Sequence, residues 1–336
     1  MEVKFVHFAG VDVSKSKIDV CVIANNHRSE IVHNCFEQSK KGFNALKKWL
    51  QQVTNQQAEK LLICVENTGL YDDALLHYLW SHSLAASLEN AANIKRSIRD
   101  NRGKTDKLDA RNIALYALKH CDELTLWEKP RDQVVELQQM LSERSRLVNA
   151  LKMLKQVQQE RKEFSWSKVV QAKSYQSGIK GLQEDIKQIE KDIWELVKSD
   201  KELLQMFVLI TSIPSIGKVT ACHFICYTNE FKLVKSGKQL ASYCGVVPFE
   251  RSSGSSLKKR ARLSHQANKI LKTLLHLCAI TAIKMKGVFA AYYRRKIEEG
   301  KSGLIAINGI RNKLALTIAA VIRNNEPYNK NYIYHH

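Results

Sequence analysis

The sequence lacks several features that would assign it to a familiar class. Its cysteines include no CxxC pair, no internal repeat or low-complexity tract is present, and no apolar run approaches the roughly 20 residues of a membrane helix. The start, MEVKFVHFAGVDVS, is typical of a strand and not of a signal peptide. We therefore expect a soluble, intracellular protein with no membrane partner. Its thiols are predicted to be reduced and mostly buried; they are Cys21, Cys35, Cys64, Cys121, Cys222, Cys226, Cys244 and Cys278.

Acidic residues are scarce relative to basic ones. The 336 residues hold 53 Lys and Arg against 33 Asp and Glu, a formal charge of +20. Residues 251–336 alone hold 17 Lys and Arg against 3 Asp and Glu. Such a surface predicts a polyanionic partner, because a nucleic-acid backbone releases counterions to it. Solubility, or unspecific contact with RNA, would account for the composition equally well, so the motifs must decide.

The first third of the chain alternates strand and helix patterns. Residues 5–13 and 17–25 are predicted strands joined by the turn SKSK, and a third strand at 30–38 completes an antiparallel meander. A helix near 41–52, a strand at 60–67, a helix at 70–82, a short strand at 84–90 and helices to about 120 follow. This alternation indicates an α/β layer structure.

From Asp132 onward the pattern is helical, with no strand signal. One helix has an apolar stripe that Arg144 interrupts, and a polar linker near 161–178 separates it from a second helix with a coiled-coil seam. An antiparallel hairpin that also forms a subunit contact fits this pattern, although packing within one chain is the alternative. The stripe is Val134, Leu137, Leu141, Val148 and Leu151; the seam is Ile179, Leu182, Ile186, Ile189, Ile193 and Leu196.

These patterns divide the chain into three predicted domains. Residues 1–125 form the α/β domain, residues 126–202 a coiled-coil dimerisation domain, and residues 203–336 a mainly helical domain. Near the start of the last domain, SIPSIGKVTA has a glycine-containing turn before a helix. The backbone N–H groups of such a turn, together with Lys218, could hold phosphate as a helix-hairpin-helix element does. A plain turn between helices is the alternative.

Four acids in the first domain form an uncommon set. Asp12 lies within a predicted strand, Glu66 ends another, and Asp106 and Asp109 are three residues apart at a helix start, which places them on one face. Each alone could be a solvated strand edge or a helix cap. Together they offer the hard oxygen ligands that Mg²⁺ prefers, in a set suited to phosphodiester cleavage.

The segments that carry these acids resemble a known family. GVDVSKSKIDVCV, VENTGLY and KTDKLDARNIALYA resemble the three signature blocks of the DEDD-type insertion-sequence transposases, the insertion-sequence one-ten family, whose relatives include pilin-gene invertases. The resemblance covers nearly the whole chain. It implies an RNase H-like, RuvC-like catalytic domain in which Asp12, Glu66, Asp106 and Asp109 bind Mg²⁺ or Mn²⁺. One departure is Asn90-Ala91, where the family often has Asn-Pro.

The resemblance also implies a nucleophilic serine. YCGVVPFERSSGSSLKKRAR resembles the C-terminal block of the family, in which a serine before a glycine attacks DNA; that serine is Ser253, with Ser252 as a competitor. Without the family, SSGSS would be interpreted as a flexible linker. The basic residues that follow could hold phosphate during the attack; they are Lys258, Lys259, Arg260 and Arg262. Further on, Asn268 is a predicted helix cap.

Family membership implies a complete function. The expected activity is excision and insertion of a mobile element. The expected partners are donor and target DNA and a structured non-coding RNA that acts as guide. We expect a homodimer, or a tetramer on DNA, in the bacterial cytoplasm. Two alternatives are a junction-resolving nuclease that uses only the four acids and a non-catalytic nucleic-acid-binding module. Insertion and inversion both stay open.

Overall fold

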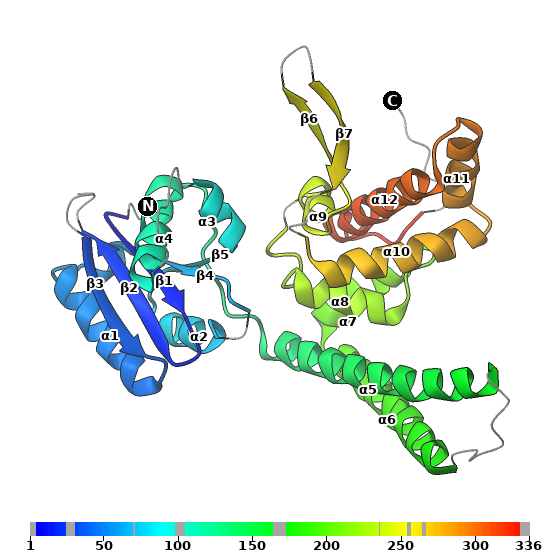
Figure 1. Cartoon of the computed structure of the whole chain (residues 1–336), viewed down its shortest axis with the longest axis horizontal. Coiled ribbons are helices and arrows are strands. Elements are labelled where there is room, and N and C mark those ends of the chain that lie inside the picture. Colours follow the sequence, from blue (N-terminus) through cyan, green and yellow to red (C-terminus); the bar gives the residue numbers. More distant parts are fainter. Residues whose placement is uncertain are drawn as a thin grey trace. The chain divides into compact units, whose positions relative to one another are not determined.

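The chain divides into two compact units, residues 1–129 and 130–336 (Figure 1). The computed structural model describes residues 5–24, 31–69, 71–97, 105–163, 173–234, 236–253, 257–263 and 267–329. The first unit holds the α/β segment, and the second holds the long helices together with the C-terminal part. The predicted boundary near residue 202 between a coiled-coil domain and a C-terminal domain stays a prediction.

A five-stranded sheet in the order β3-β2-β1-β4-β5 forms the centre of the first unit. Strands β1 (His7–Val13), β2 (Lys17–Ile23) and β3 (Ile31–Glu37) are the predicted antiparallel meander. Strands β4 (Leu61–Glu66) and β5 (Ala86–Glu89) run parallel to β1. The predicted mixture of strands and helices is confirmed.

Helices cover both faces of this sheet. Helices α1 (Lys40–Val53) and α2 (Asp73–Ser81) pack against Ala9, Val11 and Val13 of β1 and the matching residues of its neighbours. Helices α3 (Ala91–Ser97) and α4 (Asp106–His120) pack on the other face, where Phe8 and Leu62 point. Because strand side chains alternate, even-numbered residues of β1 and β4 face α4.

The second unit is mainly helical. One apolar core joins the root of the first two helices to the others, so the hairpin and the C-terminal helices share buried side chains. The helices are α5 (Asp132–Glu163), α6 (Lys173–Ser199), α7 (Lys201–Thr211), α8 (Lys218–Tyr227), α9 (Gly237–Tyr243), α10 (Lys269–Lys284), α11 (Val288–Glu298) and α12 (Gly303–Asn324). As predicted, the Asn268 side chain caps α10 by accepting from Leu271 N at 3.0 Å.

Helices α5 and α6 pack against each other as a hairpin. Arg144, which interrupts the apolar stripe of α5, reaches Glu190 of α6 with its Nε 2.8 Å from Oε1. The predicted linker overlaps the end of α5 and the start of α6, and its central residues 164–172 lie outside the described residues. Supercoiling and dimerisation through this hairpin stay predictions.

A β-hairpin breaks the helical pattern. Strands β6 (Pro248–Ser253) and β7 (Leu257–Leu263) form a separate antiparallel sheet that projects from the helices of its own unit (Figure 1). The expectation that this part of the chain has no strands was wrong. Four basic residues in seven hide the strand pattern, since a strand with polar side chains on both faces shows no apolar alternation.

Helix α12 is long and apolar enough to cross a membrane by length and composition, and α10 with α11 passes the same test as a pair bent by 87°. The sequence itself predicts no such segment, because no uninterrupted apolar run approaches this length. In α12, Ile310, Leu314, Ala315 and Ile318 are buried in the core of the second unit, so part of the apolar composition of this helix serves packing there. The cytoplasmic location stays a prediction.

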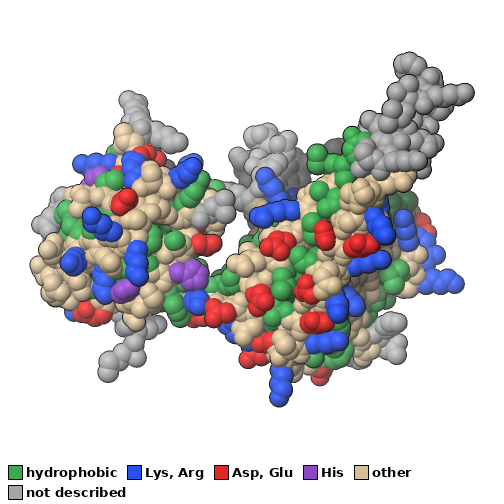
Figure 2. Space-filling view, turned by 90° about the horizontal axis from the view of Figure 1, so that it is seen from below, with side chains coloured by type: hydrophobic (Ala, Val, Ile, Leu, Met, Phe, Trp, Pro, Cys, Tyr) green, Lys and Arg blue, Asp and Glu red, His purple; other side chains and the backbone are tan. Residues whose placement is uncertain are grey.

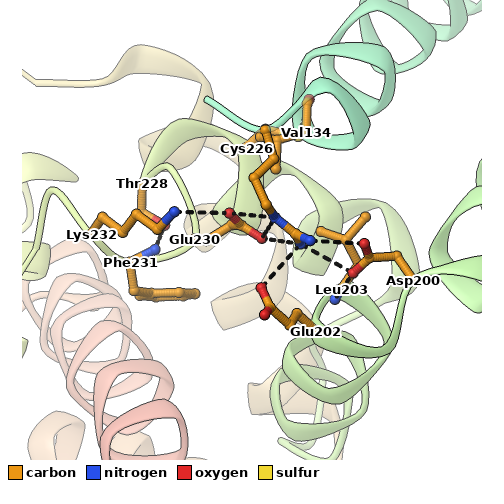
Figure 3. Close-up of polar contacts among 10 residues, drawn as sticks. Val134, Asp200, Glu202, Leu203, Cys226, Thr228, Glu230, Phe231 and Lys232 are labelled. Carbon is orange, nitrogen blue, oxygen red and sulfur yellow. Dashed lines mark hydrogen bonds and ion pairs between the residues drawn. The ribbon is translucent and has the colours of Figure 1, made fainter. Parts of the chain in front are cut away.

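A buried ion cluster fixes the root of the long hairpin (Figure 3). Arg131, just before α5, contacts Asp200, the N-cap of α7, with Nη1 to Oδ2 at 2.8 Å, and Glu230, with Nε to Oε2 at 3.1 Å. The Glu230 side chain is 3% exposed and also lies near Lys232. The Arg131 guanidinium lowers the pKa of Asp200. One guanidinium thus ties α5 to two turns that are distant in sequence.

We predict that Arg131→Ala destabilises the second unit by about 3–5 kcal/mol, because it leaves the Glu230 carboxylate buried without its guanidinium. Urea unfolding followed by circular dichroism measures the change. Adding Glu230→Gln to Arg131→Ala should recover part of the loss. Lys191→Ala, which breaks the exposed pair with Glu195, is the control and should change stability by less than about 0.5 kcal/mol. If Arg131→Ala lowers the free energy of unfolding as little as the control does, Arg131 does not stabilise the second unit.

Candidate active site

Strand alternation places three carboxylates on the face of the sheet that α4 covers. Asp12 pairs with Asp19 across β1 and β2. Val11 pairs with Val65 in the parallel register of β1 and β4, so Glu66 follows beside Asp12. The three acids stand on neighbouring strands and on the same side of the sheet as Cys21 and Cys64, which pack against α3 and α4.

Helix α4 lies unusually close to β1 at Gly10. A Cβ on Gly10 would lie 2.1 Å from Ala114 N and 2.2 Å from Ala110 O, so a side chain there would displace the helix. Gly10 shares its face of β1 with Asp12, and Ala110 directly follows Asp109. The close approach therefore brings the first turn of α4 to the end of the strand where Asp12 lies. Thr105 caps that turn by accepting from Leu108 N at 3.3 Å.

The charges of all four predicted acids meet at Asp12. Burial raises the pKa of the Asp12 carboxyl to about 6, and repulsion from Glu66, Asp109, Asp106 and Asp19 adds to the shift. Groups that act on one carboxyl in this way share one small region. The structure thus gathers Asp12, Glu66, Asp106 and Asp109 from β1, β4 and the first turn of α4. Their role as metal ligands stays a prediction.

Lys17, Asp19 and His33 also belong to this site, and they are not among the residues predicted from the sequence. Lys17 Nζ lies 2.5 Å from Asp106 Oδ2 and 3.0 Å from Asp19 Oδ2, and these bonds raise the pKa of Lys17. His33 Nε2 lies 3.0 Å from the other Asp19 oxygen, Oδ1. The short turn SKSK carried a usable signal, because its length sets the register that pairs Asp12 with Asp19.

The donor set fits a hard divalent cation. Oxygen ligands predominate, the acids repel one another, and the ammonium group of Lys17 already supplies a positive charge to two of them. Within the described residues, no three His, Cys, Asp or Glu side chains lie close enough together to enclose an ion. In this structure Asp106 is instead paired with Lys17, and metal binding by the four acids stays a prediction.

The predicted serine lies at the tip of the β6–β7 hairpin. Ser253 ends β6 and pairs with Leu257, Ser252 pairs with Lys258, and Arg251 pairs with Lys259. Arg260 and Arg262 continue β7. Gly254 and the side chains of both strands, including that of Ser253, lie outside the described part of the structure. The nucleophile and the phosphate contacts on this hairpin stay predictions.

The predicted phosphate-binding turn joins α7 to α8. Gly217 is the N-cap of α8 and has no side-chain cap, and Lys218 begins the helix. Lys218 Nζ lies 5.0 Å from the centre of the Trp194 ring, a cation–π contact with α6. This geometry is compatible with either a phosphate site or a plain turn between helices.

The basic excess does not form one continuous patch on the face drawn in Figure 2. There Lys and Arg side chains lie over both units, with Asp and Glu side chains among them. On this face, therefore, local arrangements of the described side chains decide where a polyanion could bind.

We predict that Asp12→Asn stabilises the first unit at pH 7.5 in EDTA by about 1–3 kcal/mol. The raised pKa of Asp12 means that the folded state holds its proton longer than the unfolded state between about pH 4 and pH 6. Stability conferred by the protonated form is lost as the pH rises through this window. The gain from Asp12→Asn should vanish near pH 4. Chemical unfolding at both pH values measures it, and the exposed Asp122→Asn is the control. An equal gain at both pH values would contradict the electrostatic cause.

Two family models match the chain. Residues 9–160 match the DEDD transposase model of the IS110 type, described as a transposase, and residues 208–294 match the IS116/IS110/IS902 transposase family. The first match covers the strands and helix that carry the four acids. The second covers α8 to most of α11, including the β6–β7 hairpin.

Similar proteins extend over nearly the whole chain. The pilin gene-inverting protein of Moraxella bovis is 30% identical over 328 residues, which cover 96% of this chain and 98% of that protein. The Moraxella lacunata protein of the same name is 29% identical over the same shares. Among solved structures, Thermus thermophilus RuvC with a Holliday junction substrate matches 36% of this chain and 99% of its own at 11% identity and a TM-score of 0.27. The chain belongs to the IS110 family of DEDD transposases, DNA-recombining enzymes.

Proposed function

We propose that the chain moves a DNA element by metal-dependent cleavage at Asp12, Glu66, Asp106 and Asp109. The observation that carries this proposal is the convergence of four carboxylate charges at the end of β1, beside an α4 that Gly10 admits close to the sheet. The strand order β3-β2-β1-β4-β5, with β2 antiparallel to both neighbours, supports an RNase H-like assignment of the first unit. The cation is Mg²⁺ or Mn²⁺, since the ligands are all carboxylates.

The protein groups have distinct tasks in this reaction. The divalent cation, when bound, supplies the positive charge that stabilises the attacking and leaving oxygens. In this proposal Asp12 and Glu66 bind the cation from the adjacent strands β1 and β4, and Asp106 and Asp109 bind it from the first turn of α4. Lys17 neutralises Asp106 and Asp19 before the ligands are engaged, which keeps five acids together at neutral pH.

Ser253 is the proposed nucleophile. Its Oγ bonds to phosphorus while the P–O bond to one strand end breaks; the serine proton is passed on to the departing oxygen, so that this end leaves as a free hydroxyl and the other stays attached through a phosphoserine ester. The adjoining strand supports this assignment, because β7 pairs with the strand that ends at Ser253 and its sequence holds four basic residues, Lys258, Lys259, Arg260 and Arg262. A water-only nuclease would use the four acids without Ser253.

The full proposal includes donor and target DNA, an element-encoded guide RNA, and assembly through α5 and α6 as a dimer or tetramer. Excision and insertion are the proposed outcome. The two relatives named for pilin gene inversion favour inversion of a DNA segment as the second candidate, since they match the chain from end to end.

Replacement of any of the four acids by Ala should abolish Mg²⁺-dependent nicking of a supercoiled element substrate. The fold and most DNA binding should persist, because these side chains serve metal binding and not core packing. Asp122→Ala is the matched control, since it removes an exposed carboxyl of the same unit. If two of the four variants nick DNA at the rate of the parent protein, the four acids do not form the proposed metal site.

A second experiment tests whether the serine and the acids act across subunits. Asp12→Ala and Ser253→Ala proteins, each inactive alone, should regain cleavage when mixed if Ser253 of one subunit serves the acids of its neighbour. Each mixed dimer would then hold one intact centre. The Ser253→Ala protein alone should also form no covalent DNA adduct on a denaturing gel. Complete inactivity of the mixture, with subunit exchange confirmed, would place serine and acids in one chain.

A further inference from the structure

A groove of about 690 Å³ lies in the second unit between α11, α12 and residues 326–329. Three aromatic side chains, Phe289, Tyr292 and Tyr328, line it together with three cationic ones, Arg295, Lys313 and Arg323. None of these residues belongs to the acid site or to the β6–β7 hairpin. Phe289 is part of the apolar core of the second unit, and Tyr292 and Tyr328 pack partly against that core while they also line the groove beside positive charge.

Tyr292 organises the cations at one wall of the groove. Lys313 Nζ lies 5.0 Å from the centre of its ring, the Arg295 guanidinium 5.6 Å and Lys296 Nζ 5.8 Å. The ring lies against α12, where a Cβ on Gly309 would be 2.5 Å from Tyr292 Oη. Contact with one aromatic ring holds three like charges close together.

Acidic residues offset only part of this charge. Glu299 pairs with Lys296 at 2.5 Å and with Arg295 at 3.6 Å. Lys313 and Arg323 form no ion pair with any carboxylate of the described residues, although Glu326 lines the same groove. Since Lys313, Arg295 and Lys296 all contact the Tyr292 ring, an anion bound beside them would relieve their mutual repulsion.

Tyr328 forms a fixed aromatic wall. Its backbone N–H donates to Ser212 Oγ at 2.8 Å, and Gln205 Nε2 donates to Asn325 Oδ1 at 2.6 Å. Asn325 has φ 55°, which turns the chain back after α12. These bonds hold the backbone of residues 325–328 against α7 and the turn that follows it, and the Tyr328 ring packs partly against the apolar core of the second unit.

We propose that this groove binds an unpaired nucleotide of single-stranded DNA, with its phosphate at Lys313 and Arg295 and its base stacked on Tyr328. Cationic groups beside an aromatic surface are how proteins bind single strands without sequence preference. The volume lies within the range of pockets for small ligands. DNA is the favoured source because the chain belongs to a family of DNA transposases, and this choice rests on the proposed function.

The test uses the full-length protein in EDTA, so that its result does not depend on cleavage at the acid site. A 12-nucleotide single-stranded DNA carrying one 2-aminopurine reports stacking by fluorescence quenching, and anisotropy reports affinity. Tyr328→Leu should lose the quenching and weaken binding roughly tenfold. Tyr328→Phe should retain both. Lys313→Gln should weaken binding and lower the salt slope by about 0.7. Lys284→Gln, an exposed lysine outside the groove, is the control.

Three results would overturn the proposal. One is unchanged quenching in Tyr328→Leu with a circular dichroism spectrum like that of the parent protein. Another is a loss of affinity for duplex DNA in Tyr328→Leu and Lys313→Gln that is as large as their loss of affinity for single-stranded DNA. The third is single-stranded RNA that binds tenfold more tightly than DNA and loses that preference in both variants, which would assign the groove to RNA. The proposal is supported if Tyr328→Leu and Lys313→Gln weaken the binding of single-stranded DNA and Lys284→Gln does not.

Discussion

The close contact between β1 and α4 at Gly10 is the constraint on which the rest of the first unit depends. Any other residue at position 10 would place a Cβ inside the backbone of α4. With glycine, the helix packs through Ala110 and Ala114, and its first turn reaches the end of β1. Four carboxylates from three elements can then share one small region, and the Thr105 cap keeps that turn helical.

Much of this arrangement could be predicted from sequence, because it follows from local periodicity. The strand meander, the strand at 61–66 and the positions of Asp12 and Glu66 follow from alternation and strand ends. The residues Asp19, Lys17 and His33 were missed because each is an ordinary polar residue until the register of β2 is fixed. Gly10 was missed for a related reason, since a close approach of two backbones leaves no periodic signal.

In the second unit, strand pairing and long-range ion pairs could not be predicted from the sequence. Its core helices are visible as apolar patterns, but β6 and β7 are not, because Ser, Lys and Arg occupy most positions of the two strands and leave no apolar alternation in the sequence. Arg131 gave no signal either, since its partners Asp200 and Glu230 lie 69 and 99 residues away. Long-range ion pairs and strand pairing depend on the fold as a whole, whereas helices and capping depend on neighbours in sequence.

The position of Arg131 also bears on how the chain can be divided. Arg131 is the second residue of the second unit, and all its carboxylate partners belong to that unit. The four acids, Gly10 and α4 belong to the first. Among the described residues, each apolar cluster lies within one unit, as do the ion pairs of Arg131. The polypeptide can be treated as two modules joined at one peptide bond, suited to exchange with the corresponding halves of relatives or to expression as a split enzyme.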